Sequence, residues 1–236
     1  MTRDNLTIKK LDSPFYDRPD VVRVARDLLG KVLVTNIGGH HPSGPSGHHT
    51  SGPGAHHPSG PGAHHTSGRI VEVEAYNGII DRASHAWSGR RTRRTEVIFG
   101  QGGAAYVYLI YGIYHLFNVV TNRKDVPHAV LIRALEPLEG IPTMLKRTGK
   151  PKLDHTLTRG PGNLSKAMGL LTTHTGTSLL GDEIYIGDDG YRPKRGEIIA
   201  TPRIGVDYAG EDAKLLYRFF LKGNKYISGN KRQNQP

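Results

Sequence analysis

Carboxylate, imidazole and phenol side chains are concentrated in one short stretch of the chain. Glu72 and Glu74 alternate with Val71 and Val73, so a β-strand period places both carboxylates on one face and the valines on a face that enters the core. If one carboxylate is partly shielded from water, it can act as a general base, because burial raises its pKa. A solvated polar face of an ordinary strand is the alternative interpretation.

Tyr76, Asp81 and His85 extend this group toward the C-terminus. Glu72, Glu74, Asp81 and His85 also carry oxygen and nitrogen atoms that could bind a metal ion, so a metal-dependent nuclease or hydrolase is a second hypothesis. Their spacing matches no compact metal-ligand motif. The chain has no cysteine, which excludes disulfides, thiolate metal sites and thiol nucleophiles. We therefore expect acid–base chemistry without a metal or another cofactor.

A compact basic run follows this group, consisting of Arg90, Arg91, Arg93 and Arg94. The formal net charge is +11, and residues 39–68 contribute none of it, so the rest of the chain is more basic than the average suggests. This balance is typical of proteins that bind polyanions, nucleic acid before anionic membrane. The run is either solvated surface or a set of phosphate contacts, and its position beside the candidate site favours the contacts.

Residues 104–110 and 113–121 are rich in aromatic and β-branched side chains and flank Tyr111-Gly112, which predicts a β-hairpin. Tyr106 and Tyr108 share one face of the first strand, where they could pack in a core or stack on a base. Core packing explains Tyr111 poorly, because it lies at the turn. An exposed aromatic at a hairpin tip on a basic protein indicates a wedge that enters between stacked bases.

The remaining elements must position these residues. Strand 31–37 is expected to pair with strand 69–76, and Arg133 lies in an apolar strand at 129–135, where a charge requires an anionic partner such as Glu74, Glu136 or a phosphate. Asp17 is the expected cap of a helix at 19–29. Further helices are expected around 138–147 and 163–170, and further strands at 183–186, 198–206, 217–221 and 225–228.

An eight-residue repeat of Gly, Ala, His, Pro, Ser and Thr occupies residues 39–68. Such a composition cannot bury an apolar core, so it predicts a disordered loop that expands the turn between two strands. Its histidine pairs could bind Zn, Ni or Cu weakly, but a plain linker is the favoured interpretation. We expect one domain over 1–229, interrupted by this loop at 39–68, and a flexible tail at 230–236.

Several longer runs resemble the alkyladenine (3-methyladenine) DNA glycosylase family, in the family's order and at compatible spacings. They are RIVEVEAYNG, DRASHAW, YVYLIYGIYHLFNVV, AVLIRALEPLEG, RGPGNLSKAMGL and TPRIGVDYAG. The resemblance extends from about Leu29 to Ser228, excluding the repeat, and several long motifs together are highly specific. It implies an α+β fold: a single compact domain around a curved antiparallel β-sheet with flanking helices and a protruding β-hairpin.

The resemblance also implies an activity, the monofunctional hydrolysis of the N-glycosidic bond of damaged purines such as 3-methyladenine, 7-methylguanine, hypoxanthine and ethenoadenine. Carried over by motif, Glu74 resembles the base that activates the attacking water. Arg133 resembles the arginine that helps to hold this water or the adjoining phosphate. Tyr111 resembles the residue that intercalates into the duplex.

Four further residues resemble the pocket for the flipped base. Tyr76, His85 and Tyr108 resemble its walls, and Asn118 resembles the residue that discriminates against guanine by crowding its exocyclic amine. The implied partner is double-stranded DNA containing damaged purines, bound by a monomer without a cofactor or a membrane. The expected location is intracellular and DNA-associated, in the cytoplasm or nucleoid of a prokaryote or the nucleus of a eukaryote. A metal-dependent nuclease and a non-catalytic nucleic-acid-binding module are the alternatives.

Overall fold

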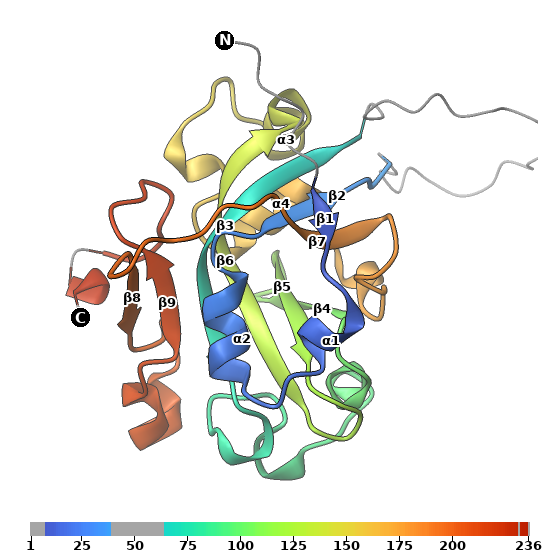
Figure 1. Cartoon of the computed structure of the whole chain (residues 1–236), viewed down its shortest axis with the longest axis vertical. Helices are drawn as coiled ribbons and strands as arrows, with labels where there is room; N and C mark the ends of the chain where they lie inside the picture. Colours follow the sequence, from blue (N-terminus) through green and yellow to red (C-terminus); the bar gives the residue numbers. More distant parts are fainter. Residues whose placement is uncertain (1–7, 39–63, 231, 236) are drawn as a thin grey trace, which may run out of the picture.

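The computed structural model describes residues 8–38, 64–230 and 232–235. Its centre is a curved antiparallel sheet with the strand order β1-β7-β2-β3-β6-β5-β4, in which β9 pairs with both β3 and β8 (Figure 1). The strands are β1 (Lys9–Lys10), β2 (Val32–Thr35), β3 (Thr66–Tyr76), β4 (Ala105–Ile110), β5 (Tyr114–Thr121), β6 (His128–Glu139), β7 (Ile184–Asp188), β8 (Ile198–Thr201) and β9 (Arg218–Leu221). The predicted α+β fold is confirmed.

Short helices flank this sheet: α1 (Ser13–Tyr16), α2 (Val21–Leu28), α3 (Ile141–Thr148) and α4 (Pro161–Met168). Helix α2 packs against β3 and β6 through an apolar face that contains Val21, Val24 and Leu28. Its cap is Asp20, whose side chain accepts a hydrogen bond from the Arg23 N–H at 2.9 Å. The prediction of Asp17 as the cap is wrong, because Asp17 instead ends α1.

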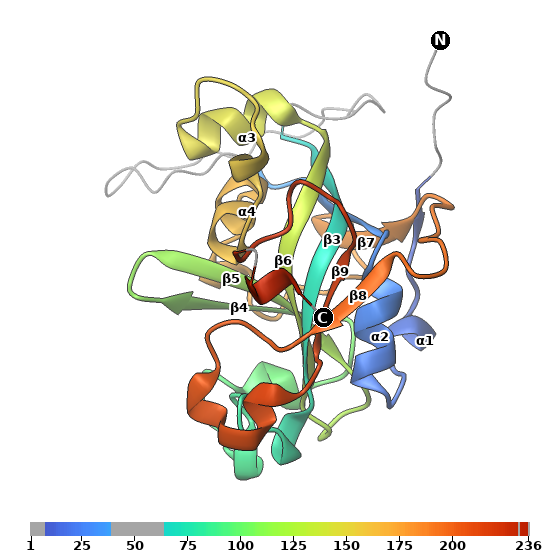
Figure 2. The same ribbon diagram turned by 90° about the vertical axis from the view of Figure 1, so that its left-hand side faces the viewer.

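The hairpin of β4 and β5 is confirmed, and it projects from the body of the molecule (Figure 2). Its base packs in the main core, where Val107 and Phe117 are buried together with side chains of α2, α4, β3 and β6. Its tip extends beyond this core and carries Tyr111 at 83% exposure. No helix in the described part of the chain is long and apolar enough to cross a membrane.

Strand β3 begins earlier than the sequence predicts. Thr66, Ser67 and Gly68 belong to β3 and pair with β2, so the predicted disordered loop at 39–68 is wrong for its last three residues. The Thr35 and Thr66 hydroxyls, 2.7 Å apart, satisfy each other inside the sheet. Gly68 lies against Leu135, where a Cβ would approach the Leu135 Cβ to 3.0 Å. Residues 39–63 of the predicted loop lie outside the described residues.

Two expectations for the C-terminal part differ from the structure. Residues 225–228 do not form a strand, and the expected strand at 198–206 ends at Thr201, immediately before Pro202. Within the expected flexible tail, Arg232–Asn234 forms a short 3₁₀ helix. This helix is held by Arg218, which donates hydrogen bonds to the Gln233 carbonyl at 2.7 Å and the Asn234 Oδ1 at 2.8 Å.

Candidate active site at the bulge in strand β3

The two glutamates lie where β3 exchanges one neighbouring strand for another. Its first half pairs with β2, its second half pairs with β9, and β6 flanks it on the other side. The register with β6 shifts on either side of Glu72, which leaves Val71 of β3 and Arg133 of β6 as extra residues. Bulges re-aim side chains and are common beside functional sites. Here the bulge in β6 directs Arg133 toward both glutamates.

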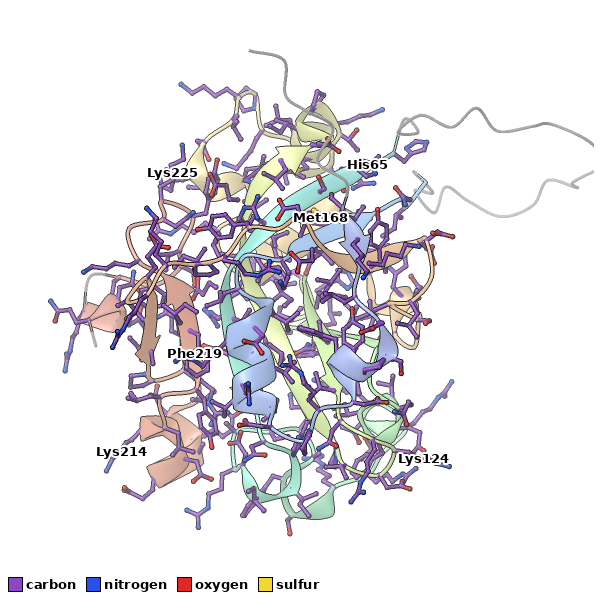
Figure 3. The ribbon with its side chains drawn as sticks, viewed as in Figure 1. His65, Lys124, Met168, Lys214, Phe219 and Lys225 are labelled. Carbon is purple, nitrogen blue, oxygen red and sulfur yellow. The ribbon has the colours of Figure 1, made fainter. Side chains whose placement is uncertain are left out.

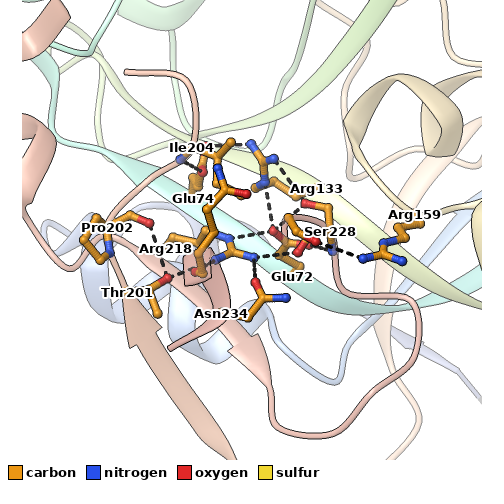
Figure 4. Close-up of polar contacts among 12 residues, drawn as sticks. Glu72, Glu74, Arg133, Arg159, Thr201, Pro202, Ile204, Arg218, Ser228 and Asn234 are labelled. Atoms are coloured by element: carbon orange, nitrogen blue, oxygen red, sulfur yellow. Dashed lines mark hydrogen bonds and ion pairs between the residues drawn. The ribbon is translucent and has the colours of Figure 1, made fainter. Parts of the chain in front are cut away.

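Glu72 is fully buried and engaged by several donors (Figure 4). Its Oε1 accepts hydrogen bonds from the Nε atoms of Arg133 and Arg218, at 2.9 and 2.7 Å. Ser228 donates its hydroxyl to Oε1 at 2.8 Å and its backbone N–H to Oε2 at 2.6 Å. Burial acts to raise the pKa of Glu72, but Arg133, Arg218 and Ser228 outweigh burial and hold this pKa below its ordinary value. Glu72 is therefore an anion enclosed by protein.

Glu74 is also fully buried, but its three polar partners belong to the wall of a cavity. Tyr76 Oη donates to Oε2 at 3.0 Å, and Arg133 Nη1 lies 3.2 Å from the same oxygen. The backbone N–H of Ile204 donates to Oε1 at 2.8 Å. Burial acts to lower the pKa of Arg133, whereas Glu74 and Glu72 raise it more strongly, so the guanidinium stays charged between the two carboxylates.

The cavity has a volume of about 730 Å³, within the range of small-molecule pockets. Its lining includes all four residues predicted to form a base pocket, Tyr76, His85, Tyr108 and Asn118. The rings of His85 and Tyr108 meet edge to face, with their centres 4.7 Å apart. Glu74 itself does not line the cavity, but Tyr76, Arg133 and Ile204 do. The carboxylate therefore lies directly behind the wall.

His85 is held in its neutral form. Burial, together with Arg94 and Arg90, lowers the pKa of His85 to about 4. Its Nδ1 lies 2.9 Å from Tyr106 Oη, and its Nε2 lies 3.5 Å from Arg94 Nη2. A neutral imidazole has one donor and one acceptor nitrogen, so His85 presents a directional hydrogen-bonding group to the cavity rather than a positive charge.

Asn118 is fixed in orientation at the buried end of the hairpin. Its Nδ2 donates to the carbonyls of Tyr106 and Leu116, at 3.1 and 3.2 Å. These two bonds use both amide hydrogens, so the side chain cannot rotate freely. A rigid amide in a cavity wall is suited to excluding a substituent by contact.

Tyr111 occupies the hairpin turn with a backbone φ of 53°, followed by Gly112 at 71°. Within the three residues that join β4 and β5, the N–H of Ile113 donates to the Ile110 carbonyl at 3.2 Å, and both residues between them have positive φ, a conformation that strains a tyrosine. Its side chain is 83% exposed. An exposed aromatic in a strained position is not explained by packing, so the role of Tyr111 as a wedge stays a prediction that its exposure allows.

The four predicted phosphate-binding arginines have different surroundings. Arg91 forms ion pairs with Glu96 at 2.6 Å and with Asp125 at 2.9 Å. Arg94 lines the cavity, with its guanidinium 5.0 Å from the centre of the Tyr108 ring. Arg90 and Arg93 are exposed and form no ion pair with any residue that the structure describes. To bind a phosphate, Arg91 would have to break its ion pairs with Glu96 and Asp125, whereas Arg90 and Arg93 have no such pairs to break among the described residues.

The ligands of the alternative metal site do not converge. Asp81 accepts hydrogen bonds from Arg203 Nη1 at 2.5 Å and Arg203 Nη2 at 2.8 Å, while Glu72 is engaged by Arg133 and Arg218. In the described ranges, no three His, Asp or Glu side chains are placed to hold a metal ion together. Two of the proposed carboxylates are instead neutralised by arginines.

Comparison with known proteins agrees with this geometry. The model of the methylpurine-DNA glycosylase family matches residues 58–225. The chain belongs to this family. It is 44% identical over 226 residues to a protein of Alkaliphilus oremlandii, covering 93% of this chain and 98% of the relative. It is 40% identical over 227 residues to a protein of Clostridium perfringens (93% and 98%) and 42% identical over 227 residues to one of Bacillus cytotoxicus (93% and 99%).

The names of all three relatives contain the words 3-methyladenine DNA glycosylase. The methylpurine-DNA glycosylase family is a family of DNA-repair hydrolases that act on DNA, so the recognition of the family from the sequence motifs is confirmed. The motifs TPRIGVDYAG and RGPGNLSKAMGL had suggested membership without suggesting roles, and the structure shows where they lie.

In this member of the methylpurine-DNA glycosylase family, both motifs supply cavity wall that reasoning from single residues missed. Ile204 provides the backbone N–H that holds Glu74, and Tyr208 lines the cavity at 72% exposure. Residues 159–163, at the start of α4, line another part of the wall. A backbone donor has no side-chain signature, so only the family motif could have indicated Ile204.

Proposed function

We propose that this protein excises damaged purines from duplex DNA by hydrolysing the N-glycosidic bond, with Glu74 as the base that activates water. The observation that carries the proposal is the placement of a buried carboxylate behind an aromatic cavity that is large enough to admit a purine nucleotide. A carboxylate has about four acceptor sites, and hydrogen bonds from Tyr76 and Ile204 occupy two of them, while Arg133 forms an ion pair with Oε2. An acceptor site is therefore available to a water molecule.

In the proposed reaction, the water oxygen attacks C1′ of the damaged nucleotide while Glu74 accepts a proton from that water. The bond from C1′ to the base nitrogen breaks, and the base leaves with the bonding electrons. A cationic 3-methyladenine or 7-methylguanine leaves as a neutral molecule, whereas hypoxanthine or ethenoadenine requires a proton as it departs. No lysine lines the cavity in the part of the chain that the structure describes, so we propose no covalent lyase step.

The cavity walls account for recognition of the flipped base. Tyr76 and Tyr108 provide aromatic surfaces for the purine ring, and neutral His85 provides a hydrogen bond to its edge. The fixed amide of Asn118 would contact the exocyclic amine of guanine and disfavour it. Undamaged bases also cost more to unpair and unstack, which adds to the selectivity.

The hairpin accounts for extrusion of the damaged nucleotide. We propose that a monomer bends the duplex, with Arg90, Arg93 and Arg94 bound to phosphates, and that Tyr111 enters from the minor groove to fill the gap. Replacing Tyr111 with Ala should reduce excision from duplex DNA about tenfold and affect excision from single-stranded DNA less. The unfolding temperature should change little, because the side chain packs against no core.

The direct test of the activity is a duplex that contains one hypoxanthine, incubated with the protein in EDTA. Release of free base and formation of an alkali-labile abasic site is the expected result. If no hypoxanthine is released from the DNA, a duplex with 7-methylguanine is tested next, because this cationic base needs no proton to leave. Binding without release of either base would favour the non-catalytic module. Cleavage of undamaged phosphodiesters that depends on added metal would favour the nuclease.

A further inference from the structure

A second cavity, of about 490 Å³, lies beside the first. Arg159 lines both cavities, so they are neighbours on one tract of surface. The second cavity is formed by β8, β9 and the residues that follow β9, on the side of the molecule that faces the viewer in Figure 2. None of the motifs discussed above assigns a role to it.

The chemistry of this cavity combines a basic rim with an apolar floor. Lys222, Lys225 and Arg159 supply the rim, and Phe220 and Ile227, both largely buried, supply much of the floor. Within the described ranges, none of the three cations forms an ion pair with a carboxylate. Arg159 is fixed by a hydrogen bond from its Nη2 to the Gly229 carbonyl at 2.9 Å.

The neighbouring acidic groups bond to residues other than Lys222 and Lys225. Glu136 Oε2 accepts a hydrogen bond from Asn224 Nδ2 at 2.8 Å, and Glu72 is enclosed by Arg133, Arg218 and Ser228. Lys222 and Lys225 are exposed on the residues immediately after β9, and no carboxylate of the described residues pairs with them. Their positive charge is therefore available to a ligand. An anion with an apolar portion fits both the rim and the floor.

We propose that this second cavity binds the sugar-phosphate backbone of the damaged strand, on one side of the flipped nucleotide. A phosphodiester supplies the anion for Lys222 and Lys225, and the deoxyribose supplies apolar surface for the floor. Arg159 joins the two cavities, so one continuous strand can place a nucleotide in the first and its neighbours on the second. This inference rests on the proposed glycosylase function, because it takes the first cavity as the place of the flipped base.

The test measures DNA binding as a function of salt concentration, using an undamaged duplex so that no catalysis is needed. Each phosphate contact contributes about 0.9 to the slope of log affinity against log salt, so Lys222→Gln/Lys225→Gln should reduce this slope by about 1.8. Between 50 and 200 mM salt, the affinity of the unaltered protein should therefore fall about tenfold more than that of the variant. An unchanged slope would overturn the proposal.

The matched control is Lys9→Gln/Lys124→Gln, which removes the same charge elsewhere. Lys9 is on β1, which β7 and β2 separate from β3, the strand that pairs with β9, and Lys124 and Lys225 lie at opposite corners of the view in Figure 3. The control should change the slope by less than about half as much, because it alters only the long-range field. Equal effects of the two variants would show a general loss of positive charge and would contradict a local site.

A second measurement tests which side of the damaged base is bound. Duplexes with hypoxanthine near one end or near the other are compared, and the substitutions in the second cavity should weaken binding of only one of them. A variant that weakens both equally would overturn the placement on one flank. Failure of the glycosylase function would appear separately, as an absence of base release by the unaltered protein from any duplex.

Discussion

Glu72 and Glu74 lie on the same face of β3 and are both shielded from solvent, yet their surroundings differ. Glu72 is enclosed by Arg133, Arg218 and Ser228. Arg218 in turn donates hydrogen bonds to the Ser228 carbonyl and to Asn234 in the C-terminal segment. Glu74 shares only Arg133 with it, and its other donors belong to the cavity wall. The comparison teaches that burial alone does not distinguish the two carboxylates. They differ in whether their partners enclose them within the protein or form the wall of a cavity.

Arg133 connects the two carboxylates, with Nε on Glu72 and Nη1 near Glu74. Arg218 supplies the second positive charge, so the four buried groups are neutral as a set. Without Arg218, one arginine would have to neutralise two carboxylates. The cluster on the Glu72 side thus leaves Nη1 of Arg133 to pair with Glu74 next to the cavity.

The largest expected effect separates the two glutamates by activity. Glu74→Gln should lower the single-turnover rate of hypoxanthine release about 10³-fold or more, because general-base catalysis contributes about 10²–10⁴-fold and the amide cannot accept the proton. DNA binding should persist, since Glu74 is buried and makes no surface contact. A rate within tenfold of the unaltered protein would assign the base to another residue.

The two glutamates should also differ in how much they contribute to the stability of the fold, which Glu72→Gln tests. Removing one partner of a buried ion pair leaves charge uncompensated, so the free energy of unfolding should fall by about 3–5 kcal/mol, measured by urea denaturation. Glu74→Gln should cost less, because Arg133 would keep Glu72 as its partner. The control is the double variant Glu72→Gln/Arg218→Met, which removes one charge of each sign and should recover part of the loss. No recovery would contradict the pairing of Glu72 with Arg218.

The acid dependence of stability should show the same difference. The pKa of Glu72 lies below its ordinary value in the folded chain, so the unfolded chain takes up the proton first as the pH falls. The contribution of Glu72 is complete above the unfolded pKa of about 4.3 and is lost as the pH falls through the folded pKa. The gap in unfolding free energy between the unaltered protein and Glu72→Gln should be constant from pH 7 to 5 and narrow below about pH 4. A gap that widens on acidification would contradict this ionisation.

The sequence predicted part of this arrangement for sound physical reasons. Strand alternation placed Glu72 and Glu74 on one face, and the apolar surroundings of Arg133 required an anionic partner, for which Glu74 was one of three candidates. The hairpin followed from Tyr111-Gly112 between two alternating segments. These inferences depend on neighbours in sequence, which is why they could be made.

The rest depends on groups that are distant in sequence. Glu72 bonds to Arg218, which lies 146 residues away in the sequence. The local sequence RFFL, which begins with Arg218, does not indicate that this arginine is fully buried. Strict alternation would place Ile70 and Val71 on opposite faces of β3, but both side chains are buried in the core. The bulges that allow this, and that turn Arg133 toward the glutamates, arise from the pairing of β3 with β6. The tail was expected to be flexible because it is a chain terminus, but buried Arg218 needs the acceptors that Gln233 and Asn234 provide.

The smallest expected effect comes from this tail, and it tests whether the Glu72 side extends to the C-terminal segment. Asn234→Ala removes one of the acceptors of Arg218 Nη2, which keeps its bond to the Ser228 carbonyl. Unfolding free energy should fall by about 1 kcal/mol, the typical net contribution of one hydrogen bond. Gln235→Ala is the matched control, because the Gln235 side chain is exposed and makes no hydrogen bond with the residues described. Combined with Glu72→Gln, the effect of Asn234→Ala should shrink, because Arg218 is then already displaced from its carboxylate; full additivity would show that the tail stabilises the fold independently of Glu72.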